Sequence, residues 1–375
     1  MIPRLLIDNL QRELAAGRVW MLFGARRVGK TSLVQEYLRS RTERWFTGQG
    51  EDATVAELLR SCSAERFRQA FGGYDGVFLD EAQTVPKIGT ALKLLVDVLP
   101  GLKVIVTGSS AFHLDQSLGQ PLTGRRRVAF LHPVSCAEIR AWKGPLAAAG
   151  LVEDLLLYGS YPEVLQIGDP AERRRYLRQL VQDYLFQDLL AFEQLRNARK
   201  LRDLVHLIAH QVGAEVSLNE LANILQIHKA TVERYLDLLE KNFVLYRNGG
   251  FSRNLRKEVT KSARYYFVDT GIRNAVIDQF QPLRLRPDTG ALWENFVINE
   301  RRRRNDYGQL ERKGYFWRTY DQQEIDWVEQ DVDGRLEGFE CKWQEQRYQA
   351  PAGWRRSYPE APVHLVHREN FGDFF

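Results

Sequence analysis

A glycine-rich loop between an apolar run and a helical stretch restricts the fold of this chain more than any other feature. Gly24 and Gly29 stand five residues apart, and Lys30 and Thr31 follow at once, which completes the spacing GxxxxGK[ST]. Residues 19–23 are all apolar, and apolar residues at helical spacing follow the loop. This context predicts a buried parallel strand, a tight turn and a helix, the arrangement of a phosphate-binding loop.

Each position of the loop has a physical purpose. The two glycines let the backbone turn tightly, so that its N–H groups can face phosphate oxygens, and the following helix adds its positive end. Lys30 supplies a mobile cation for the β and γ phosphates, and Thr31 offers a hydroxyl to Mg²⁺. We therefore expect ATP and Mg²⁺ as cofactors, bound by Gly24, Ala25, Arg26, Arg27, Val28, Gly29, Lys30 and Thr31.

Two further apolar runs end in polar residues. Residues 76–79 lead into Asp80 and Glu81, and residues 103–106 lead into Thr107 and then Ser109. Ligands of a parallel α/β sheet bind at the carboxyl ends of its strands, so these side chains should face the loop. We expect Asp80 to hold Mg²⁺ and Glu81 to polarise the attacking water. Thr107 and Ser109 are candidates for sensing the γ phosphate, although an ordinary turn explains such a cluster equally well.

The length, the net charge and the cysteine spacing limit which domain organisation and which classes of function are possible. The 375 residues exceed one core, which favours two or three domains. The formal charge of +5 permits nucleic-acid binding without demanding it. The three cysteines are widely spaced, which supports neither a disulfide framework nor a zinc site. Without a signal-peptide pattern or a long apolar run, we expect a cytoplasmic protein with no membrane association.

Changes of pattern along the chain divide it into four segments. We expect an α/β core over residues 1–145, a helical segment over 146–210, two short helices with a hairpin over 211–280, and a strand-rich domain over 281–375. The hairpin is expected to turn at residues 248–250 and to return at Phe251, which gives a winged-helix arrangement. Residues 282–287 are a plausible linker.

A winged helix usually reads DNA, but the charges here are mixed. The face of its second helix carries Lys229, Thr231, Glu233 and Arg234. Phosphate contacts dominate DNA affinity, so more basic residues would be expected. A role as a packing module therefore stays open, although the wing region adds basic residues at Arg247, Arg253, Arg256 and Lys257.

The last segment contains a sparse acidic pattern. Asp326 lies in one strand-like run, and Glu340 and Lys342 lie in the next, which is the PD-(D/E)xK pattern of nucleases. Residues two apart in a strand share a face, so Glu340 and Lys342 should converge. Asp326 and Glu340 are expected to bind Mg²⁺, and Lys342 to stabilise charge or position water. Glu294 is a candidate third acid, and the arginines 301–304 would suit phosphates, although such patterns also arise by accident.

Together these motifs resemble a widespread prokaryotic family of AAA+ ATPases. The resemblance rests on GARRVGKT, VFLDEAQ, VIVTGSS and Leu122-Thr123-Gly124-Arg125, and continues through residues 158–162, 265–271 and 292–296. It implies an AAA+ core joined to a winged helix and to a nuclease-like C-terminal domain of uncharacterised function. It also implies that Arg125 completes the site of a neighbouring subunit in a ring or arc. Ser160 departs from the family, which more often has a glycine there.

The expected fold class is therefore α/β. It has a P-loop AAA+ parallel-sheet core, a helical and winged-helix region, and a C-terminal α/β domain like PD-(D/E)xK nucleases. The leading hypothesis is a Mg²⁺-dependent ATPase that binds or remodels DNA, either duplex or branched, and whose C-terminal domain is a candidate metal-dependent nuclease. The alternative is a nucleotide-controlled switch or scaffold that recruits a protein partner, with a C-terminal domain that does not cleave.

Overall fold

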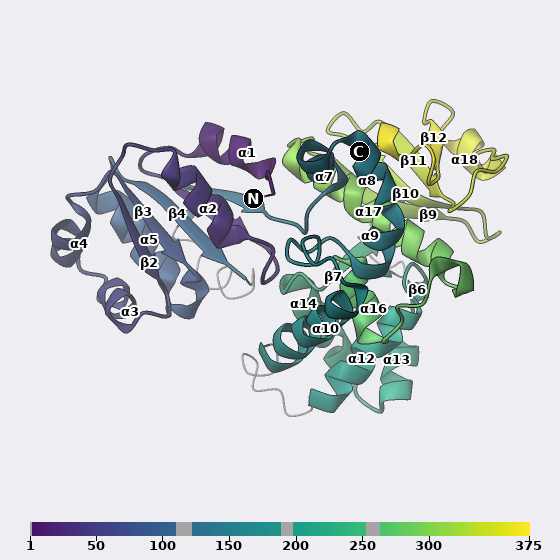
Figure 1. Cartoon of the computed structure of the whole chain (residues 1–375), viewed down its shortest axis with the longest axis horizontal. Coiled ribbons are helices and arrows are strands. Elements are labelled where there is room, and N and C mark those ends of the chain that lie inside the picture. Colours follow the sequence, from purple (N-terminus) through teal and green to yellow (C-terminus); the bar gives the residue numbers. More distant parts are fainter. Residues whose placement is uncertain (1, 110–121, 189–197, 253–262) are drawn as a thin grey trace. The chain divides into compact units, whose positions relative to one another are not determined.

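The computed structural model describes residues 2–109, 122–188, 198–252 and 263–375, which group into two compact units (Figure 1). The N-terminal unit comprises residues 3–132 and the short segment 241–243. The rest of the described chain forms the C-terminal unit. Within the described residues, no helix has the length and apolar character that crossing a membrane requires.

A parallel five-stranded sheet organises the N-terminal unit. Its order is β2-β3-β4-β1-β5. The central strands β1 (Val19–Phe23), β3 (Gly76–Asp80) and β4 (Lys103–Gly108) are the three predicted from apolar runs, and the structure confirms them. The outer strands β2 (Trp45–Gln49) and β5 (Arg126–Phe130) had no such signal, because much of each is exposed at a sheet edge.

Helices surround this sheet (Figure 1). The apolar faces of α3 (Ala53–Arg60), α4 (Ala64–Phe71) and α5 (Ile88–Val98) pack with the strands in one buried cluster that includes Leu59, Phe67, Phe71 and Leu95. Burying each such side chain contributes about 1.5–3 kcal/mol, so the cluster fixes the sheet. The unit also contains α1 (Leu6–Glu13) and α2 (Lys30–Arg39), with a 3-10 turn η1 (Ala82–Thr84) after β3.

The C-terminal unit begins with helices, as the loss of strand signals predicted. They are α7 (Cys136–Lys143), α8 (Pro145–Gly150), α9 (Val152–Tyr158), α10 (Pro170–Leu180), the π-helical stretch η3 (Val181–Asp188) and α12 (Ala198–His210). Two helices follow, α13 (Leu218–Leu225) and α14 (Lys229–Lys241). Ser217 caps α13 through its hydroxyl, which accepts from the Glu220 backbone at 3.3 Å, as the capping-box spacing predicted.

An antiparallel sheet completes this region, but its hairpin differs from the expectation. The sheet order is β6-β8-β7, from β6 (Glu215–Val216), β7 (Leu245–Gly249) and β8 (Ala263–Phe267). The predicted return at Phe251 is wrong, since β7 pairs with β8 and Phe251 instead donates its N–H to the Phe316 carbonyl at 2.7 Å. The glycines at 249–250 suggested a tight turn, but the buried aromatic strand β8 is the stronger partner. Arg253, Arg256 and Lys257 lie outside the described residues.

The last hundred residues form a mixed sheet against a long helix. The order is β12-β11-β10-β9, from β9 (Lys313–Arg318), β10 (Glu324–Gln330), β11 (Leu336–Cys341) and β12 (Val363–Val366). These strands, drawn in green to yellow, lie together at one end of the C-terminal unit (Figure 1). The long helix α17 (Thr289–Tyr307) packs on them, and the Trp293 indole donates to the Val366 carbonyl at 3.0 Å. Shorter elements of the unit are α16 (Thr270–Val276), η4 (Leu283–Leu285), α18 (Ala352–Ser357) and η5 (Phe371–Asp373).

The segment expected to be a linker is instead tied into the unit. The Arg286 side chain is buried, and it donates to Asn274 at 3.0 Å and to Asp288 at 2.8 Å. Burial alone would raise the pKa of Asp288, but the Arg286 and Arg273 guanidinium groups outweigh it and lower that pKa to about 2. Residues 282–287 therefore act as a fixed connection, because their one interior arginine satisfies several buried acceptors.

The arginine block of α17 does not form a phosphate-binding surface. Arg301 is buried and forms a two-pronged ion pair with Glu329, at 2.8 and 2.7 Å. Arg303 is buried and pairs with Glu300 at 2.6 Å. Arg302 stacks over the Tyr246 ring at 3.5 Å. The expectation of a phosphate site was wrong, because three of the four guanidinium groups already hold partners within the unit.

Replacing Arg301 tests this structural role. We expect Arg301→Met to lower the free energy of unfolding by about 3 kcal/mol, because it leaves Glu329 buried with one fewer counter-charge. The value is at the low end of the usual range, since Arg312 still pairs with Glu329 at 2.9 Å. Denaturant unfolding followed by circular dichroism measures the difference.

The matched control is Arg304→Met on the same helix. Arg304 is exposed, so its replacement should change stability by less than about 0.5 kcal/mol. Equal stability of the Arg301 and Arg304 variants would contradict the assignment of Arg301 to the interior.

Candidate functional site

Close contacts fix the backbone of the glycine-rich loop. A Cβ atom on Gly24 would lie 2.2 Å from the Leu131 carbonyl oxygen, so no larger residue fits there. Gly29 has φ 98°, a conformation that favours glycine. The Arg4 guanidinium donates to the carbonyl oxygens of Val28 and His132, each at 2.6 Å. The loop therefore keeps its shape between β1 and α2 through the sheet and through Arg4.

Lys30 is folded back into the loop. Its side chain is 4% exposed, and its Nζ donates to the carbonyls of Gly24 at 3.0 Å and Ala25 at 3.1 Å. Nζ also lies 3.9 Å from a Glu81 carboxylate oxygen. Burial lowers the pKa of Lys30, while the negative charges of Glu81 and Asp80 oppose that shift. The arrangement holds an ammonium group where phosphate oxygens would need it.

Asp80 connects three elements of the N-terminal unit. Its carboxylate accepts one hydrogen bond from the Thr31 hydroxyl at 2.8 Å and another from the Thr107 hydroxyl. Thr31 belongs to α2 and Thr107 to β4, so both flank the end of β3. The structure thus brings together the two residues predicted to hold Mg²⁺, and their oxygen atoms are the hard ligands this ion prefers.

Glu81 is held in an unusual backbone conformation by side-chain contacts. Its φ of 48° lies in the left-handed region, which non-glycine residues seldom adopt. Its N–H donates to the Thr107 hydroxyl at 3.1 Å, and its carboxylate accepts from the Gln83 side chain. The Gln83 amide also donates to the Ser109 hydroxyl at 3.0 Å. Gln83 therefore joins the predicted catalytic acid to the predicted sensor.

Gln83 was not predicted as a site residue. The only signal was its position two residues after Glu81, and that spacing becomes meaningful once the turn η1 brings both side chains to one place. The Gln83 Oε1 atom is buried and, within the described residues, accepts no hydrogen bond. A buried amide oxygen usually has a donor, so this acceptor is available to a bound water or ligand.

The other predicted nucleotide-site arginines lie at the surface. Arg26 is half-buried and its charge helps to lower the pKa of Lys30, whereas Arg27 is exposed. Arg125 lies just before β5, where its side chain, 49% exposed, forms an ion pair with Asp97. Its role in completing a neighbour's site stays a prediction.

In the C-terminal unit, the predicted acid–lysine trio does come together. Antiparallel pairing places Trp327 opposite Phe339, so that Asp326 and Glu340 are neighbours across β10 and β11. Asp326 accepts from the Cys341 backbone N–H at 2.9 Å. The Lys342 Nζ lies 2.7 Å from Glu340 and 4.0 Å from Asp326. Burial, followed by repulsion from Asp326, raises the pKa of Glu340 to about 7.

A buried arginine also contacts these acids. We call Glu294, Glu324, Asp326 and Glu340 the acid cluster. Arg264 of β8 lies 3.6 Å from Glu294, 2.7 Å from Glu324 and 3.9 Å from Asp326. Glu294 in addition accepts from the Tyr266 hydroxyl at 2.6 Å. Burial raises the pKa of Glu294 well above its usual range, and repulsion from Asp326 adds to the rise. Sequence patterns did not single out Arg264, which lies in a strand of mostly aromatic residues.

The predicted metal roles of Glu294, Asp326 and Glu340 receive no support from this geometry. Among the described residues, no three or more His, Cys, Asp or Glu side chains are placed to share a metal ion. The carboxylates are instead matched with the side chains of Arg264 and Lys342. We therefore derive no metal-dependent step at this cluster.

Comparison with protein families divides the chain into three parts. Residues 16–140 match the model of an AAA domain. Residues 150–283 match a domain of unknown function, DUF8612, and residues 289–368 match another, DUF4143. The parallel sheet, the phosphate-binding loop and this match together identify residues 16–140 as an AAA-type P-loop domain.

Similar proteins extend over most of the chain but carry no assigned activity. An uncharacterised protein of Mycobacterium tuberculosis is 29% identical over 342 residues, covering 89% of this chain and 72% of that protein. An uncharacterised protein of Methanocaldococcus jannaschii is 21% identical, covering 85% of this chain and 74% of that protein.

Among solved structures, two have low overall similarity to this chain. A signal transduction ATPase with numerous domains from Pyrococcus horikoshii, which has a tetratricopeptide repeat sensor, is 13% identical with a TM-score of 0.33. It covers 80% of this chain, which spans only 45% of that protein. A RuvB variant from Thermotoga maritima is 16% identical with a TM-score of 0.31, covering 65% of this chain and 86% of that protein.

Replacing Lys30 tests the nucleotide site. We expect Lys30→Met to weaken the binding of a fluorescent ATP analogue with Mg²⁺ by about 10- to 100-fold, the loss typical of a charge-assisted hydrogen bond. The control is Lys93→Met, which changes an exposed lysine on α5 and should leave the affinity unchanged. Equal affinity of the Lys30 variant and the wild type would contradict the placement of the phosphates at this loop.

Proposed function

We propose that the chain is a Mg²⁺-dependent ATPase that acts on DNA. One observation carries the ATPase part: Lys30, the Asp80–Thr31 pair and Glu81 meet at the carboxyl edge of one parallel sheet. Phosphoryl transfer depends mainly on such positioning and on electrostatic stabilisation. A cation for the phosphates, oxygen ligands for Mg²⁺ and a carboxylate near the attacking water are the parts that ATP hydrolysis requires.

Each residue would contribute a separate step. Lys30 would exchange its carbonyl contacts for phosphate oxygens, while Thr31 and Asp80 would hold the Mg²⁺ that neutralises the developing charge. Glu81 would orient the water and polarise its O–H bond. Gln83 would keep the Glu81 carboxylate in place through the contact they share, and would link it to Ser109, which follows the neighbouring strand β4.

A neighbouring subunit would complete this site. Arg125 is more than one-third exposed, so its ion pair with Asp97 is weak enough to give way to a nucleotide phosphate. An arginine supplied from a second copy stabilises charge in the transition state of many P-loop enzymes. We propose that the active form is a ring or arc of identical subunits.

The DNA part rests on the architecture and charge of the C-terminal unit. Support for a winged helix comes from the order of the two helices α13 and α14 followed by the β7–β8 ribbon. The exposed face of α14 is nearly neutral, because Lys229 pairs with Glu233 at 3.7 Å. We therefore expect the winged helix to position DNA through few phosphate contacts.

A basic surface on α10 would supply the phosphate contacts that the nearly neutral face of α14 lacks. Along α10, Arg174 and Arg175 line an open groove of 540 Å³ together with two glutamines and Arg178, which also pairs with Asp278 at 2.6 Å. Phosphate contacts supply most of the affinity of a DNA-binding protein, and arginine suits them through its planar donors. We assign the main phosphate contacts to this groove.

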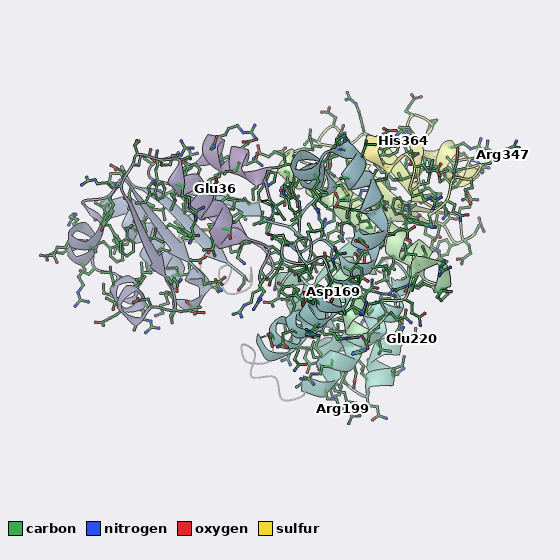
Figure 2. All side chains as sticks on the ribbon, in the orientation of Figure 1. Glu36, Asp169, Arg199, Glu220, Arg347 and His364 are labelled. Carbon is green, nitrogen blue, oxygen red and sulfur yellow. The ribbon has the colours of Figure 1, made fainter. Side chains whose placement is uncertain are left out.

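The rival function, recruitment of a protein partner, has one observation in its favour. A groove of 450 Å³ between α12 and α13 is lined by Leu207, Leu225 and Ile224, and Ile224 is 56% exposed. The charged residues of its lining are Lys200 and Asp203, and Figure 2 shows the side chains of Arg199 and Glu220 projecting outward from the same two helices, α12 and α13. A mixed polar rim around exposed apolar side chains suits a protein interface. This candidate predicts ATP turnover that DNA does not change.

The test measures ATP turnover with duplex and four-way DNA at several salt concentrations. We expect DNA to raise turnover, and the apparent DNA affinity to fall steeply as salt rises, because phosphate contacts release counterions. The variant Arg174→Gln/Arg175→Gln should reduce the salt dependence by a slope of about 2, nearly one unit per lost phosphate contact.

Two outcomes would decide against DNA as the partner. One is turnover that neither DNA changes. The other is an Arg174/Arg175 variant that retains the full salt dependence. The control is Arg335→Gln, which removes one charge at a position that is 80% exposed and distant in sequence from α10, and which should retain the wild-type salt slope.

A further inference from the structure

The acid cluster of the C-terminal unit holds its own cation. Arg264 is only 4% exposed, and its guanidinium faces carboxylates from three places, Glu294 on α17 and Glu324 and Asp326 on β10. The same guanidinium lies 4.5 Å above the centre of the Phe316 ring. These contacts come from three elements, α17, β10 and β9, so Arg264 lies inside the cluster and not at its rim.

Charge balance explains why a cation is needed there. Asp326 and Glu294 are both buried; the charge of Asp326 adds to the rise in the pKa of Glu294, and the charge of Glu324 adds to the rise in the pKa of Asp326. A carboxylate buried without a counter-charge costs several kcal/mol. Arg264 forms ion pairs with Glu294, Glu324 and Asp326. Lys342 forms ion pairs with Glu340 and Asp326. Two basic side chains thus supply the compensation that a divalent cation would otherwise provide.

A divalent cation has different requirements from a guanidinium. Mg²⁺ and Mn²⁺ need several oxygen ligands that converge at about 2.0–2.2 Å from one point. The described residues offer no such convergent group, whereas the planar guanidinium spans carboxylates that lie apart. The same acids therefore fit an arginine and do not fit a metal ion while that arginine is present.

We propose that Arg264 is the resident cation of this cluster and that it keeps divalent cations away from Glu294 and Asp326. A cation site forms at this cluster only when Arg264 is removed.

The ion pairs of the cluster also have a structural role. Arg264 belongs to β8 of the smaller sheet, and Arg318 of β9 pairs with Glu215 of β6 at 2.9 Å, so ion pairs fasten the β6-β8-β7 sheet to the β12-β11-β10-β9 sheet.

The experiment measures Mn²⁺ binding to the full-length protein without nucleotide, by electron paramagnetic resonance of the free ion. We expect the wild type to bind no Mn²⁺ at this cluster when the Mn²⁺ concentration is about 1 mM. Weak carboxylate sites begin to fill at about that concentration. Arg264→Gln keeps an amide donor and removes the charge, and it should bind one additional Mn²⁺ with a dissociation constant of about 0.1 mM or below, at least tenfold under that concentration.

Two further variants assign the binding to this place. Arg264→Gln/Asp326→Asn should lose the Mn²⁺ that Arg264→Gln gains. Arg318→Gln removes the neighbouring ion pairs but leaves Arg264 in place, so it should bind no additional Mn²⁺. The proposal is overturned if the wild type binds Mn²⁺ that Asp326→Asn abolishes, or if folded Arg264→Gln binds none.

A measurement of stability covers the case in which Arg264→Gln does not fold. Removing one member of a buried ion pair destabilises a protein strongly, whereas removing both members costs far less. The double variant Arg264→Gln/Asp326→Asn should then recover soluble, folded protein with a higher Tm than the single variant. A double variant that is no more stable than the single one contradicts the proposed role as a counter-cation.

Discussion

The N-terminal unit depends on one carboxylate, that of Asp80. Parallel pairing places β4 between β1 and β3, so the phosphate-binding loop and the acidic strand end are not adjacent in the sheet. Hydrogen bonds from Thr31 and Thr107 to Asp80 bridge that separation and define the distance between loop and acid. Glu81, which follows in a left-handed conformation, then lies beside Lys30. The chemistry proposed for ATP follows from this single meeting point.

The C-terminal unit depends on the same physical rule, that buried charges need partners. Arg264, Arg286, Arg301 and Arg303 are buried, and each has one or more carboxylates within ion-pair distance. Two of these arginines pair with residues far away in the sequence, Arg264 with Glu324 and Arg301 with Glu329, whereas Arg286 and Arg303 pair with residues two or three positions away. Because these arginines and carboxylates neutralise one another, they are not free to bind phosphates or metal ions. Arg174 and Arg175 of α10, which line an open groove, are the arginines that we propose for contact with a polyanion.

The sequence predicted the parts of the fold that follow from local patterns. The three buried strands, the loop and the convergence of Asp326, Glu340 and Lys342 were recognisable because burial and strand periodicity act on neighbouring residues. The edge strands β2 and β5, the partner of β7 and the positions of Arg264 and Gln83 were not. Each of these depends on which distant residue lies opposite in the folded chain. The Arg301–Arg304 block shows the limit clearly, because the sequence contains its charge but not the acids that neutralise it.

The central claim is that Glu81 belongs to a hydrolysis site formed by Lys30, Thr31 and Asp80. The most direct measurement compares the wild type with Glu81→Gln for binding of ATP and Mg²⁺ and for single-turnover ATP hydrolysis. We expect ATP affinity within about threefold of the wild type and hydrolysis slower by about 100-fold or more, the range expected for loss of a general base. Unchanged hydrolysis in this variant would contradict the account.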